Sequence, residues 1–144
     1  MALQSSWLIW ALLSACFAAL TALFAKIGVA GIDPDLATLL RTLIVAIVLA
    51  PFIWLTGKWS NPTTLPVKSL LGLTSSALAT GASWLCYFRA LQLGAVSKVA
   101  PVDKFSVVLV AVFAVLFLGE RPAAQEWLGI VLIGAGVLVL AFKS

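Results

Sequence analysis

Six charged residues interrupt otherwise apolar stretches of the sequence, and their side chains are the first candidates for chemistry. They are Lys26, Arg41, Arg89, Lys98, Asp103 and Lys104. Only 10% of the residues are charged, whereas a soluble domain holds about 25%. A charge inside an apolar stretch is costly, so these groups are expected to face a protein interior or a watery cavity and to pair there.

Two interpretations of these charges are open. In the first, they line a vestibule in which Arg41, Arg89 and Lys104 orient an anionic solute or gate its path, with Lys26 at the same end of the protein. Asp103 then serves as their counter-ion or as a carrier of protons. In the second, the side chains reach the lipid headgroups or form ion pairs that only hold the helices together.

Few carboxylates are available to pair with these cations. Asp33 and Asp35 are expected in a loop, so Asp103 is the only carboxylate expected within a helix at this end of the protein. Side chains of adjacent residues point about 100° apart on a helix, so Asp103 and Lys104 need not pair with each other.

Aromatic residues follow two different patterns. Trp84 and Tyr87 lie one helical turn apart and close to Arg89, where their rings can line a pocket or pack within a core. The other five tryptophans gather at the opposite helix ends, as is typical of an aromatic belt at a membrane surface. They are Trp7, Trp10, Trp54, Trp59 and Trp127.

The sequence lacks the residues that most enzymes and metal sites require. It contains no histidine, the commonest general base and metal ligand. Cys16 and Cys86 lie in apolar stretches without metal-ligand spacing. We therefore expect no catalytic site, no metal and no cofactor.

The overall composition indicates whether the protein lies in water or in a lipid bilayer. Of its 144 residues, 63% are hydrophobic, and the mean hydropathy is +1.17. A soluble chain of this size cannot bury so many apolar side chains. The composition excludes a soluble globular domain, a disordered chain and a nucleic-acid-binding module, and it predicts a protein embedded in the lipid bilayer.

The charge-free runs predict an all-α integral membrane protein with five transmembrane helices in a compact bundle. We expect helices over residues 6–29, 34–55, 67–93, 97–119 and 122–142, joined by short loops within one domain of residues 1–144. Pro34 suits the first turn of the second helix, and Pro51 is expected to kink it. Glu120 and Glu126 are expected to orient or cap the last helix. The N-terminal run has no basic leader, which favours a retained helix over a cleaved signal peptide.

Small residues recur at four-residue spacing on the third predicted helix, in the rows Gly72/Ser76/Thr80 and Ser75/Ala79/Ser83. Such rows let helix backbones approach closely, and the same hydroxyl groups can instead line a cavity. The last predicted helix repeats the theme with Gly129, Gly134 and Gly136.

The positive charges give little orientation signal. Near the helix ends on the side of the N-terminus the loops hold Lys58, Lys68 and Arg121, and the other side holds Lys26, Lys98 and Lys143. The positive-inside rule counts such charges, and here they divide evenly. Either a partner or the deeper charges set the orientation, or the chain inserts both ways and pairs antiparallel.

Five stretches in this order resemble an EamA domain of the drug/metabolite transporter superfamily. They are Phe24–Gly28 with Leu40-Arg41, Tyr87–Gly94, Val99–Val108, Phe117–Arg121, and Leu128-Gly129 with Gly134–Val137. The resemblance covers nearly the whole chain and is carried by the ordered set rather than by a single motif.

This resemblance implies a transporter of small molecules. Most relatives carry two such domains as inverted repeats, so a chain with one copy, similar to the five-helix branch, is expected to act as a homodimer. We expect a multi-pass protein of the bacterial inner (plasma) membrane that exports a small metabolite or drug-like solute by alternating access. The alternative is a membrane assembly or regulatory subunit without a substrate path. The first helix lacks the embedded glutamate of the related small multidrug resistance exporters, which argues against proton-coupled cation export by their mechanism.

Overall fold

A computed structural model describes the backbone of residues 2–142 and the side chains from Trp7 onward. Lys143, which the sequence predicts at a helix end, lies outside the described residues. Within the described range the chain is 84% helical and has no β-strand. The predicted all-α class is therefore confirmed.

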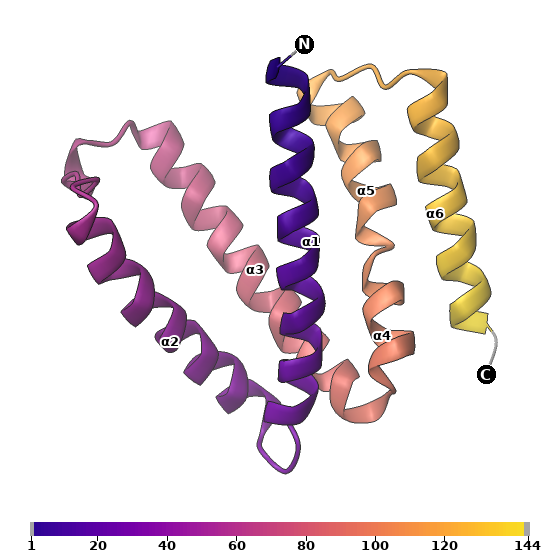
Figure 1. Ribbon diagram of the computed structural model, residues 1–144, viewed down its shortest axis with the longest axis horizontal. Coiled ribbons are helices and arrows are strands. Elements are labelled where there is room, and N and C mark those ends of the chain that lie inside the picture. The colour runs from indigo at the N-terminus through magenta and orange to yellow at the C-terminus, as the bar shows by residue number, and fades with distance from the viewer. Residues whose placement is uncertain (1, 143–144) are drawn as a thin grey trace. The chain divides into compact units, whose positions relative to one another are not determined.

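Six α-helices follow one another along residues 2–142 (Figure 1). They are α1 (Ala2–Gly28), α2 (Pro34–Leu55), α3 (Val67–Leu93), α4 (Val96–Asp103), α5 (Ser106–Phe113) and α6 (Ala124–Phe142). A 3₁₀ turn, η1 (Pro62–Thr64), lies between α2 and α3, and a π-helical turn, η2 (Ala114–Leu118), follows α5.

Local chemistry explains where α2 begins. The carboxylate of Asp33 accepts hydrogen bonds from the backbone N–H groups of Asp35 and Leu36, at 2.9 and 3.1 Å. These bonds satisfy two of the donors that a helix N-terminus leaves without a partner. Pro34 occupies the first helical position, as predicted, because its fixed φ suits a helix and it has no N–H to satisfy.

The start of α6 is also capped by a carboxylate. The backbone N–H of Ala123 donates to the carboxylate of Glu126 at 2.6 Å. A carboxylate in the first turn can reach back to the cap residue in this way and also favours the positive end of the helix dipole. The expected capping role of Glu126 is confirmed.

The observed helices follow the predicted ones, with one break. The bounds of α2 and α3 coincide with the prediction, and α2 continues through Pro51. The fourth predicted helix, residues 97–119, is instead divided into α4, α5 and η2. Pro101 has no N–H to donate, and just beyond it the N–H groups of Lys104 and Phe105 bond to carbonyls three residues back, each at 3.0 Å. This tight turn ends α4 before α5 begins.

The chain forms two compact units. One unit, here the terminal unit, combines the chain up to Ala22 with the chain from Gly94 onward. The other, the middle unit, is Leu23–Leu93, which contains the end of α1, all of α2 and all of α3.

In the terminal unit, α6 packs against α4 and α5. Gly134 marks a close approach, because a Cβ atom built on it would lie 3.1 Å from the Val108 Cγ2 atom. Gly134 and Val137 are buried there. The small-residue packing predicted for the last helix is thus observed at Gly134, whereas Gly129 and Gly136 face open space in the single chain.

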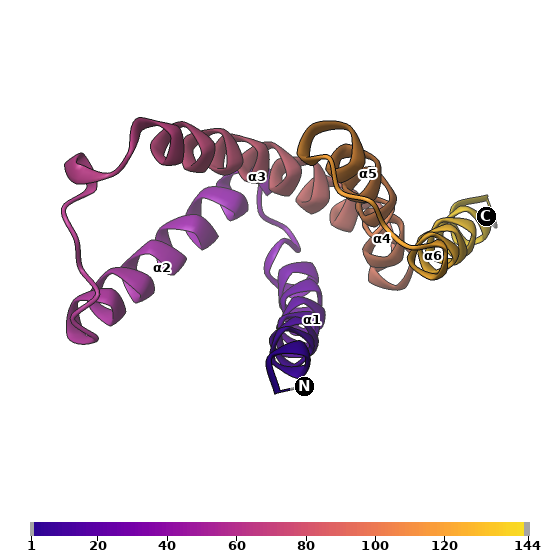
Figure 2. The same cartoon turned by 90° about the horizontal axis from the view of Figure 1, so that it is seen from above.

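In the middle unit, α2 and α3 lie side by side where α2 begins and α3 ends, and they separate toward η1 (Figures 1 and 2). We call the close end of this pair, with the end of α1, the joined end. The buried apolar residues of the middle unit lie at this end and are led by Leu91, Val29 and Phe88, whose exposed fractions are 0%, 1% and 3%. Apolar burial therefore joins the three segments where the polar contacts also gather.

The apolar helices are suited to a membrane. Within the described residues, four segments are long and apolar enough to cross one: Trp7–Gly28, Pro34–Leu55, Val96–Leu118 and Ala124–Phe142. Large apolar side chains such as Ile47 and Phe117 are 70% and 79% exposed along them. A soluble protein does not expose apolar surface on this scale, whereas lipid tails cover it without cost.

Candidate functional site

The candidate site is the joined end of the middle unit. It brings together five of the side chains singled out in the sequence: Lys26, Arg41, Trp84, Tyr87 and Arg89. They come from α1, α2 and α3. Because a helix residue rises about 1.5 Å, Arg41 lies about 10 Å along α2 from Pro34, and Trp84 lies about 13 Å from the end of α3. The two residues are therefore at matching depths in an antiparallel pair.

Two side chains close the outer edge of the site by donating to backbone carbonyl groups of a neighbouring segment. The Lys26 ammonium group donates to the backbone carbonyl of Leu91, in the last turn of α3. The Gln92 amide donates to the carbonyls of Val29 and Ile32, at 3.1 and 2.6 Å. Carbonyl groups after a helix C-terminus lack partners within the helix, so these contacts tie the α1–α2 turn to the end of α3.

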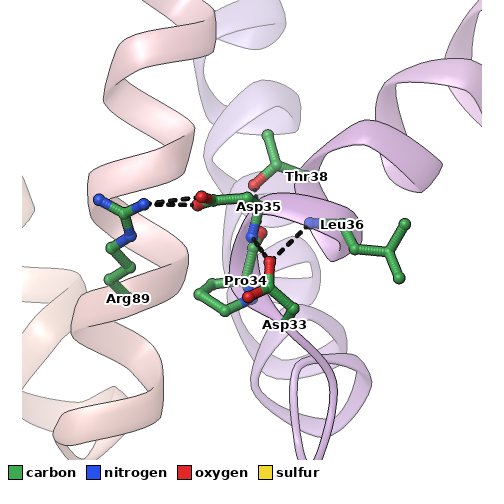
Figure 3. A network of polar contacts seen from close by, with 6 residues as sticks. All are labelled: Asp33, Pro34, Asp35, Leu36, Thr38 and Arg89. Atoms are coloured by element: carbon green, nitrogen blue, oxygen red, sulfur yellow. Dashed lines mark hydrogen bonds and ion pairs between the residues drawn. The ribbon is translucent and has the colours of Figure 1, made fainter.

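Arg89 forms an ion pair with the first turn of α2 (Figure 3). One terminal nitrogen of its guanidinium donates to both carboxylate oxygens of Asp35, at 2.9 and 2.7 Å. The neighbouring carboxylate of Asp33 points back to its own helix and caps it. The two side chains of the pair are 58% and 50% exposed in the single chain, so water weakens their attraction.

Arg41 has a different partner. The central carbon of its guanidinium lies 3.3 Å from the centroid of the Trp84 ring, which is a cation–π contact. Tyr87 meets Trp84 edge-on, with ring centroids 5.6 Å apart and planes at 79°. The Phe88 ring lies 5.6 Å from the Trp84 ring on the next turn of the same contact surface. Arg41 thus lies on the face of an indole that itself contacts two further aromatic rings.

Asp103 and Lys104 lie in the terminal unit and pair with each other at 3.3 Å. α4 ends at Asp103, and Lys104 follows it with φ of −69° and ψ of −4°. Lys98 lies in the first turn of α4.

Two residues of the site were not foreseen from the sequence. Asp35 lies in the first turn of α2 rather than in a loop, so the expectation that Asp103 is the only helical carboxylate at this end is wrong. Pro34 already predicted the helix start, and counting on from it would have placed Asp35 within the helix. Gln92 gave no such signal, because its role depends on the carbonyl groups of a distant turn.

A separate cavity of about 420 Å³ lies in the terminal unit, between α5, η2 and α6. Its walls are apolar, and its polar part is the turn that carries Glu120, Arg121 and Glu126.

The described residues hold no group of three His, Cys, Asp or Glu side chains that could bind a metal ion. The joined end presents two guanidinium groups and one ammonium group, which are chemically suited to attract an anion.

Comparison with known proteins relates the chain to membrane transporters. The model of the EamA-like transporter family matches residues 5–142. A protein of Sinorhizobium sp, "Uncharacterized transporter in cobO 3'region", is 55% identical over 139 residues, which are 96% of this chain and 99% of the relative. The "Uncharacterized transporter YxxF" of Bacillus subtilis (strain 168) is 29% identical over 142 residues, which are 94% of this chain but 42% of that relative.

A third relative comes from Yersinia pestis (strain Pestoides F) and is named "Probable 4-amino-4-deoxy-L-arabinose-phosphoundecaprenol flippase subunit ArnE". It is 31% identical over 85 residues, which are 58% of this chain and 75% of the relative. No solved structure matches the chain. The family model covers nearly every residue, and the apolar helices suit a multi-pass membrane protein. The chain therefore belongs to the EamA-like transporter family, within the drug/metabolite transporter superfamily.

Proposed function

We propose that the protein exports a small metabolite or drug-like solute across the bacterial inner (plasma) membrane by alternating access in a homodimer. The observation that supports the proposal most directly is that cationic side chains of this transporter-family chain gather at one end of a helix pair. These side chains are Lys26, Arg41 and Arg89, and they come from three different helices. Charges converging within apolar helices are typical of a solute path, and an anionic group on the solute would complement them.

In this proposal α3 is the fifth membrane span and all five spans form one domain. The helix has 27 residues, so its length of about 40 Å suffices to cross a bilayer of about 30 Å. Serine, threonine and glycine residues interrupt its leucines, which makes it less apolar than the four spans described above. Such a helix is suited to a position away from lipid, beside a path or a partner.

The length of one relative supports a pair of copies. YxxF aligns with 94% of this chain over only 42% of its own length. Two copies of this chain would therefore match the size of that transporter. Gly72 and Gly81 on α3 leave open space around them in the single chain, as a surface for a second copy requires. The even division of near-end charges is compatible with an antiparallel pair.

The remaining predicted residues keep their roles in this proposal. Arg41 orients the solute, Arg89 and Lys104 gate its path, and Asp103 serves as counter-ion or proton carrier. Trp84 and Tyr87 line the pocket beside Arg41.

A flux assay tests the proposal. Purified protein in proteoliposomes should accelerate the movement of at least one solute from a panel of small carboxylates, phosphates and neutral metabolites. Arg41→Ala and Arg89→Ala should lower that flux, and Lys58→Ala should leave it unchanged because Lys58 lies in an exposed loop away from the site. Absence of flux for the whole panel would contradict the proposal.

Orientation is tested separately with a dual reporter fused after Ser144. Reporter signals on both sides of the membrane would support an antiparallel pair. A signal on one side only would exclude dual topology.

One relative favours a second candidate, in which the chain is a subunit of a membrane assembly. ArnE is named as a subunit of a flippase for a lipid-linked sugar. Under this alternative the purified chain alone would be inactive in proteoliposomes, and activity would require a partner that copurifies from the native membrane. Activity of the chain alone would exclude it.

A further inference from the structure

Arg41 combines three features that identify its role more closely, given the transport function proposed above. Its guanidinium is stacked on the Trp84 ring at 3.3 Å. Stacking occupies one face of the guanidinium and leaves its edge free. The five N–H donors of arginine all lie in that plane and point outward from the edge.

These donors have no acceptor in the part of the chain that the structure describes, where the Trp84 ring is the recorded partner of the Arg41 side chain. The middle unit contains two carboxylates, Asp33 and Asp35. Asp33 is engaged with the N-terminus of α2, and Asp35 is engaged with Arg89 at 2.7 Å. The middle unit therefore has no carboxylate left to pair with Arg41.

The position of Arg41 makes this imbalance costly. The residue lies about 10 Å inside an apolar helix, and its side chain is partly buried. A cation at such depth requires a counter-charge or a watery path. The indole face offers a weaker attraction than a full negative charge, but it fixes the plane of the fork.

We propose that Arg41, positioned by Trp84, binds the oxyanion of the transported solute, a carboxylate or a phosphate, edge-on through two parallel N–H donors. Arg is suited to this geometry because its planar fork matches two oxygens of one anion, whereas lysine offers a single point charge. Arg89 has a different task, because its charge is already paired with the Asp35 carboxylate through one terminal nitrogen. The two arginines thus differ in task, with Arg41 for recognition and Arg89 for holding α3 to α2.

Binding of matched probes tests the assignment. We would titrate purified protein in dodecyl maltoside with benzoate, phenyl phosphate and the neutral isostere benzamide, and follow thermal stabilisation. Benzoate or phenyl phosphate should stabilise the protein, and benzamide should not. Arg41→Lys should weaken oxyanion binding by about tenfold or more, and Arg89→Lys, the matched control, should change it by less than about twofold.

Trp84 is tested as a positioning residue. Trp84→Phe keeps a ring under the guanidinium and should retain binding, whereas Trp84→Leu should lose the preference for planar carboxylate over other anions. Circular dichroism and a single monodisperse elution peak establish that each variant is folded. If Trp84→Leu fails this check, Trp84→Phe and Arg41→Lys still decide the question. Equal losses for Arg41→Lys and Arg89→Lys, or binding of benzamide as strong as that of benzoate, would overturn the assignment.

Two further arms identify the source of the oxyanion and separate this inference from transport itself. The same affinity in phosphatidylglycerol nanodiscs supports a free solute, and loss of probe binding there would show that a lipid headgroup occupies the site, which overturns the inference. Probe binding without flux would contradict the transport proposal and leave the site standing. Flux that is insensitive to Arg41→Lys would overturn the site and leave transport standing.

Discussion

Arg41 and Arg89 lie on facing helices of one unit, yet they solve the problem of a charge in an apolar setting in different ways. Arg89 lies near the end of α3, where the first turn of α2 supplies the carboxylate of Asp35 at 2.7 Å. Arg41 lies deeper, where the facing helix supplies the ring of Trp84 at 3.3 Å. Residue type is identical at both places, so the neighbour on the opposite helix determines the difference.

The two arginines differ in depth, and the kind of partner differs with it. In the first turn of a helix a carboxylate such as Asp35 is itself favoured by the helix dipole, so a complete ion pair forms there within the protein. Deeper in the helix a second buried charge would add its own desolvation cost, and an aromatic face is the less costly partner. The stacked Arg41 has no carboxylate partner among the described residues, whereas the charge of Arg89 is already paired with Asp35.

The largest expected effect concerns the core that both arginines share. Leu91 has an exposed fraction of 0%, so Leu91→Ala should lower the free energy of unfolding by about 2–5 kcal/mol through lost packing. Thermal unfolding in detergent measures the loss. Leu93→Ala is the matched control, since Leu93 lies two residues away and is 91% exposed. Equal losses of unfolding free energy for the two variants would show that the buried core at the joined end does not stabilise the unit that carries the two arginine contacts.

Charge reversal tests the paired arginine. Arg89→Asp places a second carboxylate beside Asp35 and should lower the free energy of unfolding by about 1 kcal/mol, because the pair is half-exposed and screened. The double change with Asp35→Arg should restore most of the loss. Repeating the measurement at about 1 M salt should shrink the effect, since the Debye length falls to about 3 Å. A loss that persists in the double variant would contradict a simple ion pair.

A double-mutant cycle tests the stacked arginine. Arg41→Gln and Trp84→Leu, made singly and together, should reveal a coupling free energy of about 0.5–1 kcal/mol for the cation–π contact. The same cycle on Arg89 and Asp35 should be more sensitive to salt, because the indole carries no net charge. A coupling of zero between Arg41 and Trp84 would remove the contrast between the two arginines.

The smallest effect is expected for a substitution on α3 between the two residues that contact Arg41 and Asp35. Cys86 is a free, exposed thiol on α3 between Trp84 and Arg89. Cys86→Ser should change the free energy of unfolding by less than about 0.5 kcal/mol, because the thiol takes part in neither contact. The oxyanion affinity should also stay the same. A large change in either quantity would show that this stretch of α3 acts as one unit rather than as two separate contacts.

The sequence by itself determined that the protein lies in a membrane, that its fold is all-α, and where most of its helices begin and end. Composition alone requires a membrane, since 63% of the residues are hydrophobic. The limits of α2 follow from Pro34 at its start and Gly57, with φ of 67°, after its end. These features are local, because capping and chain reversal depend on residues within a turn of one another. The same local logic would have placed Asp35 in the first turn of α2.

Only the tertiary structure decided which charged residue meets which partner. From the sequence, Asp103 was as good a partner for Arg41 or Arg89 as for Lys104, and Trp84 was equally suited to a pocket or a core. Packing of α2 against α3 sets Asp35 opposite Arg89 and Trp84 opposite Arg41. Asp103 and Lys104 pair with each other where α4 ends. Register between antiparallel helices depends on how their side chains interlock along the whole contact, and no local sequence signal encodes it.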